Sequence, residues 1–235
     1  MNAERTPSKP GAPGADATDL RHRAQRHAAL ADPTRLAIVD ALALTDAAPS
    51  ELQARLGIPS NLLAHHLGIL QRAGLIARRR SESDGRRSYL HLLRADVPLE
   101  PATAGLNAQR VVFVCTGNSA RSPLAAELWR QRSRIPVTSA GTRPAADVAA
   151  GARAAAARHD LPPLPAAPQP VTGTVRPGDL VVTVCDAAHE LLHDPGALHW
   201  SVADPAATGT DAAFDAAVAE LARRIDDLAP RLSAA

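Results

Sequence analysis

The sequence contains few aromatic and few sulfur-containing residues, and this scarcity limits what can hold the protein together. Aromatic residues make up 2% of the 235 residues although 46% of the chain is hydrophobic, so its cores must be packed with Ala, Leu and Val. There are two cysteines, Cys115 and Cys185. In a reducing compartment such cysteines are reactive or simply buried, and they do not form a structural disulfide.

The sequence also lacks a long apolar run. No stretch approaches the roughly 20 apolar residues of a membrane-spanning helix, and the polar start MNAERTPSKPGAPGADA has no signal-peptide core. We therefore expect a cytoplasmic protein with no membrane partner. The formal net charge of +2 is too small to favour any partner by itself.

Changes in composition and periodicity predict two domains. The first residues are rich in Pro, Gly, Ala and Ser without an apolar period, which predicts a disordered tail. The segment ADVPLEPATAGLNAQ separates a helical pattern from a pattern of strands and helices. The predicted parts are a tail at 1–17, a front domain at 18–95, a linker at 96–108 and a rear domain at 109–235.

The front domain is predicted to be mainly helical. The turn LGIPS between its last two helices is short enough for a helix-turn-helix. After Gly74, apolar and polar residues alternate on both sides of Asp84-Gly85, which predicts a β-hairpin. A helix-turn-helix followed by such a hairpin is a winged helix. The helices are predicted at 20–30, 33–44, 50–56 and 60–73.

A basic patch next to the recognition helix predicts DNA as a partner. Between Arg72 and Arg94 there are seven arginines but only two acidic residues. The recognition helix would enter the major groove, while arginines of the wing would meet phosphates or the minor groove. Two alternatives stay open: one of the paired histidines packs beneath the helix, and the wing arginines form a solvated face. The candidate contacts are Ser60, Asn61 and His65 on the helix, and Arg79, Arg86 and Arg87 on the wing.

The rear domain contains the segment VVFVCTGNSARSPLAAELW, a predicted strand, loop and helix. Such a loop presents backbone N–H groups in a nest at a helix N-terminus and can hold a tetrahedral oxyanion. Cys115 at its base would be a thiolate nucleophile. Arg121 can clamp two anion oxygens, Ser122 can donate to the thiolate, and Gly117 and Asn118 tolerate a left-handed backbone. A merely buried cysteine is the alternative, but it leaves the arginine and the Gly-Asn pair unexplained.

The front domain resembles the ArsR-type family of winged-helix repressors in LADPTRLAIVDALAL, HHLGILQRAGLI and DGRRSYLHL. The resemblance implies homodimers on near-palindromic operators, paired largely through the first helix. Members of that family that sense soft metals use cysteine clusters, and residues 1–107 contain no cysteine. We therefore expect no metal site in this domain.

The rear domain resembles the low-molecular-weight protein tyrosine phosphatase fold and its arsenate reductase branch, in VFVCTGNSARSPLAAELW, TSAGTRP, DLVVTVCDAAHE and HWSVADPAATGT. The resemblance implies an α/β domain with a four-stranded parallel sheet and helices on both faces. It implies that Cys115 is the nucleophile, Arg121 binds the anion, Asp204 is the general acid and Cys185 is a second redox cysteine. The implied oxyanion loop consists of Thr116, Gly117, Asn118, Ser119, Ala120 and Ser122, with Ser139 bracing it.

Three functions are consistent with these residues. Cys185, and the lack of aromatic residues after Asp204, favour an arsenate reductase. We expect no bound cofactor. Leu192 stands where thioredoxin-linked reductases have a third cysteine, so a reductase would need an external thiol reductant. A phosphatase using Cys115 is the first alternative, and a catalytically silent oxyanion or redox sensor that controls DNA binding is the second. Cys185 could instead be a small hydrophobe at a strand end, and Asp204 a turn former.

Overall fold

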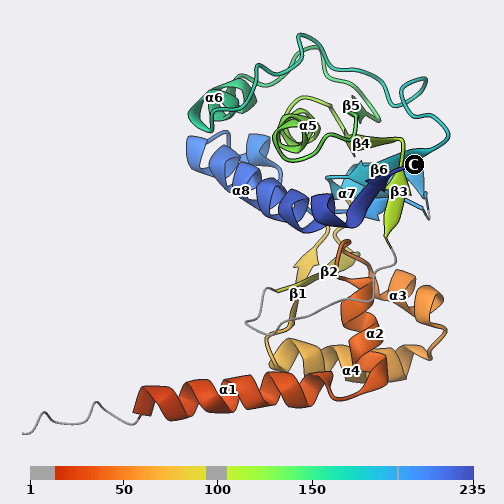
Figure 1. Ribbon diagram of the computed structural model, residues 1–235, viewed down its shortest axis with the longest axis vertical. Coiled ribbons are helices and arrows are strands. Elements are labelled where there is room, and N and C mark those ends of the chain that lie inside the picture. Colours follow the sequence, from red (N-terminus) through yellow and green to blue (C-terminus); the bar gives the residue numbers. More distant parts are fainter. Residues whose placement is uncertain (1–13, 94–104, 195) are drawn as a thin grey trace, which may run out of the picture.

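The computed structural model describes residues 14–93, 105–194 and 196–235 (Figure 1). Most of the predicted tail and linker therefore lies outside the described residues. The described residues correct the inner end of each predicted segment. Residues 14–17, predicted as part of the disordered tail, are the start of a helix, and residues 106–108, predicted as part of the linker, form a short strand. Within the described part of the chain, no helix is long and apolar enough to cross a membrane.

The front domain has the winged-helix order that the sequence predicts. Asp32 caps the second helix by accepting a hydrogen bond from the Arg35 backbone N–H at 2.9 Å, and Pro33 opens its first turn. Gly57 ends the third helix in the left-handed conformation, with φ of 65°. The elements are α1 (Gly14–Leu30), α2 (Pro33–Ala41), α3 (Pro49–Leu56), α4 (Ser60–Arg72), β1 (Ile76–Arg80) and β2 (Ser88–Leu92).

The sheet of the rear domain is four-stranded and parallel, in the order β5-β4-β6-β7. The central strand β4 is buried along nearly its whole length, as its Val-rich sequence predicts. This arrangement confirms the predicted fold class. The strands are β4 (Arg110–Cys115), β5 (Val137–Gly141), β6 (Asp179–Thr183) and β7 (Leu198–His199), and the helices are α5 (Arg121–Arg132), α6 (Ala150–Arg158), α7 (Asp186–Leu192) and α8 (Asp211–Leu228).

A second small sheet that the sequence did not predict joins the two ends of the rear domain. β3 (Leu106–Ala108) pairs in parallel with β8 (Leu232–Ala234). Two 3₁₀ turns, η1 (Pro205–Ala207) and η2 (Ala229–Arg231), complete the elements. The C-terminal segment is therefore tied to the segment that enters the rear domain.

Four of the five aromatic side chains lie in the core of the rear domain, and three of them are close to one another. The ring of Phe113 lies 6.1 Å from that of Trp129 and 5.7 Å from that of Trp200, between ring centroids. The remaining core is filled by Val, Leu and Ala. A chain with few aromatic residues thus concentrates them beneath the central strand that carries Cys115.

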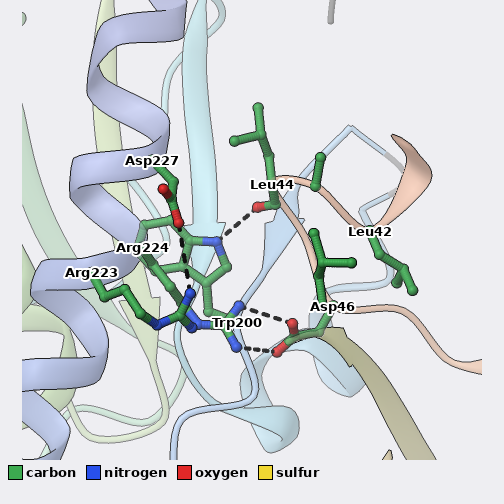
Figure 2. A pocket seen from close by; sticks show the side chains of 9 residues that line it. Leu42, Leu44, Asp46, Trp200, Arg223, Arg224 and Asp227 are labelled. Carbon is green, nitrogen blue, oxygen red and sulfur yellow. Dashed lines mark hydrogen bonds and ion pairs between the residues drawn. The ribbon is translucent and has the colours of Figure 1, made fainter. Parts of the chain in front are cut away.

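The two domains are held together by a buried ion pair (Figure 2). Arg224 of α8 donates two hydrogen bonds, at 2.9 and 2.8 Å, to the two carboxylate oxygens of Asp46 in the front domain. Asp46 also accepts a bond from the Ser201 backbone N–H at 2.7 Å. Beside this pair, the indole N–H of Trp200 donates to the Leu44 carbonyl at 2.9 Å. A buried bidentate pair requires a defined docking geometry.

A second part of the interface is a cluster of rings beneath the wing. The ring of Tyr89 on β2 lies against His199, with centroids 4.5 Å apart, and His199 stacks on His189 at 4.1 Å. His189 reaches the Glu51 carboxylate of the front domain at 3.2 Å. Tyr89 therefore docks the second strand of the wing hairpin on the rear domain, and Figure 1 shows the hairpin reaching toward that domain.

Candidate active site

The loop between β4 and α5 is folded so that its N–H groups face a pocket. The N–H of a peptide unit points away from its carbonyl. When the loop carbonyls accept hydrogen bonds on the outer side of the loop, its N–H groups therefore point toward the pocket. The side chain of Ala120, the N-cap of α5, is a methyl group. It therefore accepts no hydrogen bond from the backbone N–H groups of the first helical turn. The carbonyls of Cys115, Thr116, Gly117 and Ser119 accept hydrogen bonds from the backbone N–H groups of Thr142, Arg143, Ala145 and Ala149, at 2.8 to 3.1 Å.

Cys115 lies at the base of this loop, with 3% of its surface exposed. Its sulfur lies 3.1 Å from the Ser122 hydroxyl and accepts a hydrogen bond from the Asn118 backbone N–H at 3.2 Å. Cys115 thus lies at the floor of the loop, where its sulfur contacts a hydroxyl group and a backbone N–H. This is the position that a nucleophile would need to attack an anion held by the loop.

Asn118 braces the loop from inside. It is fully buried and has a left-handed backbone, with φ of 49°. Its amide nitrogen donates to the hydroxyls of Ser122 and Ser139, both at 2.9 Å. Its oxygen accepts from the Gln169 backbone N–H at 2.8 Å. All the polar atoms of this buried side chain therefore have partners, which keeps the loop rigid.

Gly141, at the end of β5, lets the loop approach the sheet. A Cβ atom at this position would lie 2.8 Å from the Thr116 carbonyl oxygen and 3.0 Å from the Asn118 backbone nitrogen. Both neighbours are backbone atoms that cannot move aside independently. The glycine of the TSAGTRP segment is therefore part of the loop support, a role that the sequence analysis did not assign.

Arg121 and Asp204 meet at the open side of the loop. One terminal nitrogen of Arg121 donates to the Val202 carbonyl at 2.9 Å, and the other lies 3.3 Å from the Asp204 carboxylate. The second Asp204 oxygen accepts from the Ala206 backbone N–H at 3.2 Å and caps η1. Asp204 therefore forms the turn at Pro205 and also faces the arginine.

Cys185 lies at the junction of β6 and α7, on the wall of the same pocket as Cys115. Its sulfur is 3.4 Å from the hydroxyl of Thr116, the residue that follows Cys115. Burial raises the pKa of the Cys185 thiol above its usual range. At neutral pH this second thiol is therefore protonated until a base or a change in its surroundings activates it.

One pocket of about 340 Å³ brings most of these predicted residues together. Cys115, Arg121, Cys185 and Asp204 all line it. Asn118, Ser122 and Ser139 lie behind the loop and support it. The predicted loop residues on the wall are Thr116, Gly117, Ser119 and Ala120, and the residues that the sequence did not predict there are Glu82, Ser83, Asp186, Ala187 and Ala206.

The comparison with protein families agrees with this geometry. A family model for low molecular weight phosphotyrosine protein phosphatase matches residues 110–235, more than half of the chain. The chain belongs to the low molecular weight phosphotyrosine protein phosphatase family. The match confirms the expected enzyme type of the rear domain. A model for a helix-turn-helix domain matches residues 30–79 and confirms that the front domain contains a helix-turn-helix.

Several solved structures of phosphatase-like proteins are similar to about half of the chain. An arginine phosphatase, YwlE from Geobacillus stearothermophilus, is 26% identical, with a TM-score of 0.44, covering 52% of this chain and 91% of its own. The arsenate reductase from Archaeoglobus fulgidus is 26% identical, with a TM-score of 0.43, and the match covers 51% of this chain and 98% of the reductase. The tyrosine phosphatase AmsI from Erwinia amylovora is 20% identical, with a TM-score of 0.48, and the match covers 54% of this chain and 94% of the phosphatase. No curated protein matches the chain.

The candidate DNA-contacting residues divide into two groups in the structure. Ser60, Asn61 and His65 are exposed on the first half of α4, whereas His66 is buried beneath the helix. On the wing, Arg86 and Arg87 are exposed. Arg79 instead donates a hydrogen bond to the Ser201 carbonyl of the rear domain. The recognition helix is thus accessible while one wing arginine is engaged in domain contact.

Proposed function

We propose that this protein is a DNA-binding transcriptional regulator whose phosphatase-like domain reduces arsenate with its two cysteines. The observation that carries the proposal is that Cys185 lines the pocket of Cys115 and contacts Thr116 at 3.4 Å. A phosphatase that hydrolyses its intermediate with water has no use for a second thiol at this place. A reductase requires one.

In the first step, the Cys115 thiolate attacks arsenic and forms a sulfur–arsenic bond. The N–H groups of the loop and Arg121 hold the anion oxygens. Asp204, 3.3 Å from Arg121, gives a proton to the departing oxygen, which leaves as water. The product of this step is a Cys115–arsenate adduct in which arsenic is still pentavalent.

In the second step, Cys185 gives its proton to solvent, and the resulting thiolate attacks the sulfur of Cys115. A disulfide forms, the sulfur–arsenic bond breaks, and its electron pair stays on arsenic, which leaves as trivalent arsenite. The two cysteines are oxidised as arsenic is reduced, so the electrons balance. An external thiol must then reduce the disulfide, because Leu192 occupies the position at which a third cysteine would relay it.

A phosphatase remains the second candidate, favoured by the family match and by the raised pKa of Cys185. In that reaction Cys115 would form a phosphocysteine, and Asp204 would activate water to hydrolyse it. Both candidates use the same nucleophile and anion clamp, so only the fate of the intermediate distinguishes them.

In the front domain, we propose that α4 reads operator DNA through Ser60, Asn61 and His65. We also propose a homodimer paired through α1, which places two recognition helices on a near-palindromic site. Loss of operator binding in an Asn61→Ala variant, with retained folding, would support this part. Arg86 and Arg87 are the proposed phosphate contacts of the wing.

A single-turnover reaction of the reduced protein with arsenate tests the catalytic part. We expect one equivalent of arsenite and a Cys115–Cys185 disulfide, detected by mass spectrometry, and neither product from a Cys185→Ser variant. Hydrolysis of an aryl phosphate without arsenite formation would instead identify a phosphatase. A protein that binds arsenate without either product would be a sensor.

A further inference from the structure

The tip of the wing forms part of the catalytic pocket. Glu82 and Ser83 belong to the loop between β1 and β2 of the front domain, yet both line the pocket of Cys115. The Glu82 carboxylate lies 3.5 Å from the guanidinium of Arg121. Both of its oxygens also accept from the Asp204 backbone N–H, at 3.1 Å each. A negatively charged group of the DNA-binding domain thus touches the anion clamp.

The wing tip is held in this place by a second set of contacts. The Glu82 backbone N–H donates to the Asp186 carboxylate at 3.0 Å, and the Ser81 hydroxyl donates to Glu190 at 2.8 Å. Asp186 is itself paired with the buried ring of His199 at 3.1 Å. The Glu82 carboxylate is therefore positioned next to the arginine by its backbone as well as by its own charge.

The segment 201–204 connects the wing contacts to the anion clamp. At three positions of this segment, Arg79 donates to the Ser201 carbonyl, Arg121 donates to the Val202 carbonyl, and the Asp204 N–H donates to Glu82. A movement of Arg121 toward a bound anion therefore acts on the same backbone that holds two residues of the wing.

A carboxylate and a tetrahedral oxyanion compete for a guanidinium because each accepts its N–H bonds and carries negative charge. We propose that Glu82 acts as an intramolecular anion that competes with the oxyanion substrate for Arg121, so that oxyanion binding releases the wing tip from the rear domain. The proposal rests on the oxyanion-binding role of Arg121 in the proposed function, but not on Cys185 or on turnover.

The exposure of the groups fits a contact that a ligand can displace. The Glu82 side chain is 44% exposed and that of Arg121 only 9%. An ion pair with one partially exposed partner contributes little free energy, whereas the loop offers an oxyanion several N–H groups together with Arg121. Because such coupling is reciprocal, anything that holds the wing away from the pocket, such as DNA on Arg86 and Arg87, should strengthen oxyanion binding.

Phosphate titration of the reduced full-length protein by calorimetry tests the competition. Glu82→Gln keeps the size of the side chain and removes its charge, so we expect phosphate to bind about two- to fivefold more tightly, the range of an exposed ion pair. Asp84→Asn, on the same wing, is the matched control and should bind like the unaltered protein. Equal or weaker binding by Glu82→Gln, or no phosphate binding by the unaltered protein, would overturn the proposal.

Hydrogen exchange of the unaltered protein tests the release of the wing without any substitution. Saturating phosphate should speed exchange in peptides covering 80–88, because the Glu82 N–H loses its bond to Asp186. Unchanged or slower exchange there would contradict release. Failure of the reductase reaction alone, with phosphate effects as expected, would refute the role of Cys185 and leave the competition by Glu82 intact.

Discussion

Removal of the Asp46 carboxylate should weaken the docking of the two domains. Asp46 is 3% exposed and Arg224 is 8% exposed, so the pair is almost completely shielded from water. Loss of one partner of a buried pair costs about 3–5 kcal/mol because the other charge stays buried. Arg224 keeps a contact with Glu220, which offsets part of the loss. We therefore expect Asp46→Ala to cost about 3 kcal/mol, at the lower end of that range.

Urea denaturation followed by tryptophan fluorescence can measure this cost. Trp200 lies at the interface and bonds to Leu44, whereas Trp129 is buried inside the rear domain. A Trp129→Phe background therefore isolates the signal of the interface. The matched control is Asp226→Ala, which breaks the pair with Arg132 at a carboxylate that is 54% exposed, and it should cost less than about 1 kcal/mol.

A double-mutant cycle separates the pair from the rest of the interface. In Asp46→Ala/Arg224→Ala no charge is left buried without a partner, so the double variant should be less destabilised than the sum of the two single variants. If Asp46→Ala stays within about 0.5 kcal/mol of the unaltered protein, the buried pair does not hold the domains together and the reasoning is wrong.

Three further predictions concern the loop and its surroundings. Gly141→Ala places a methyl group 2.8 Å from a backbone oxygen of the anion-binding loop and should weaken phosphate binding on the order of tenfold; Gly85→Ala, where a Cβ meets nothing within 4 Å, should leave calorimetric binding unchanged. Because burial raises the pKa of Cys185, disulfide formation after arsenate addition should accelerate as pH rises from neutral through the usual thiol range, and a pH-independent rate in quenched-flow alkylation would contradict its role as the attacking thiolate. Burial lowers the pKa of His199, so the unfolded chain binds a proton at this residue more readily than the folded chain does. This contribution to stability is present above about pH 6.5 and is lost as pH falls through the lower folded pKa. Urea denaturation should therefore show a smaller loss of stability in acid for His199→Gln.

Much of the local structure could be predicted because its signals lie close together in the sequence. The period of the apolar residues located the helices of the front domain, and Asp84-Gly85 located the hairpin. In the rear domain, the Val-rich run before Cys115 predicted the buried strand β4 (Arg110–Cys115), and Arg121 was correctly placed at the start of α5 (Arg121–Arg132). The spacing of the residues was enough to predict the loop, because the strand, the nest of N–H groups and the helix follow one another in the sequence without interruption.

The supports of the loop could be predicted only in part. Asn118, Ser122 and Ser139 belong to short segments that a family resemblance can identify. Gln169 contributes only its backbone N–H, so no property of its side chain pointed to this role. Gly141 matters because a Cβ atom added there would lie 2.8 Å from a backbone oxygen of the loop. The sequence pattern of neither segment shows how closely the two approach.

The sequence by itself determined the two domain types, the order of most of their elements, and the places of Cys115 at the end of a strand and of Arg121 at the start of a helix, because each depends on neighbouring residues. Only the tertiary structure decided that the wing docks on the rear domain and that Glu82 enters the pocket of Cys115. Such placement depends on the Asp46–Arg224 pair and on ring packing between residues more than a hundred positions apart. Periodicity describes which face of an element is apolar, but it does not describe which distant face will cover it.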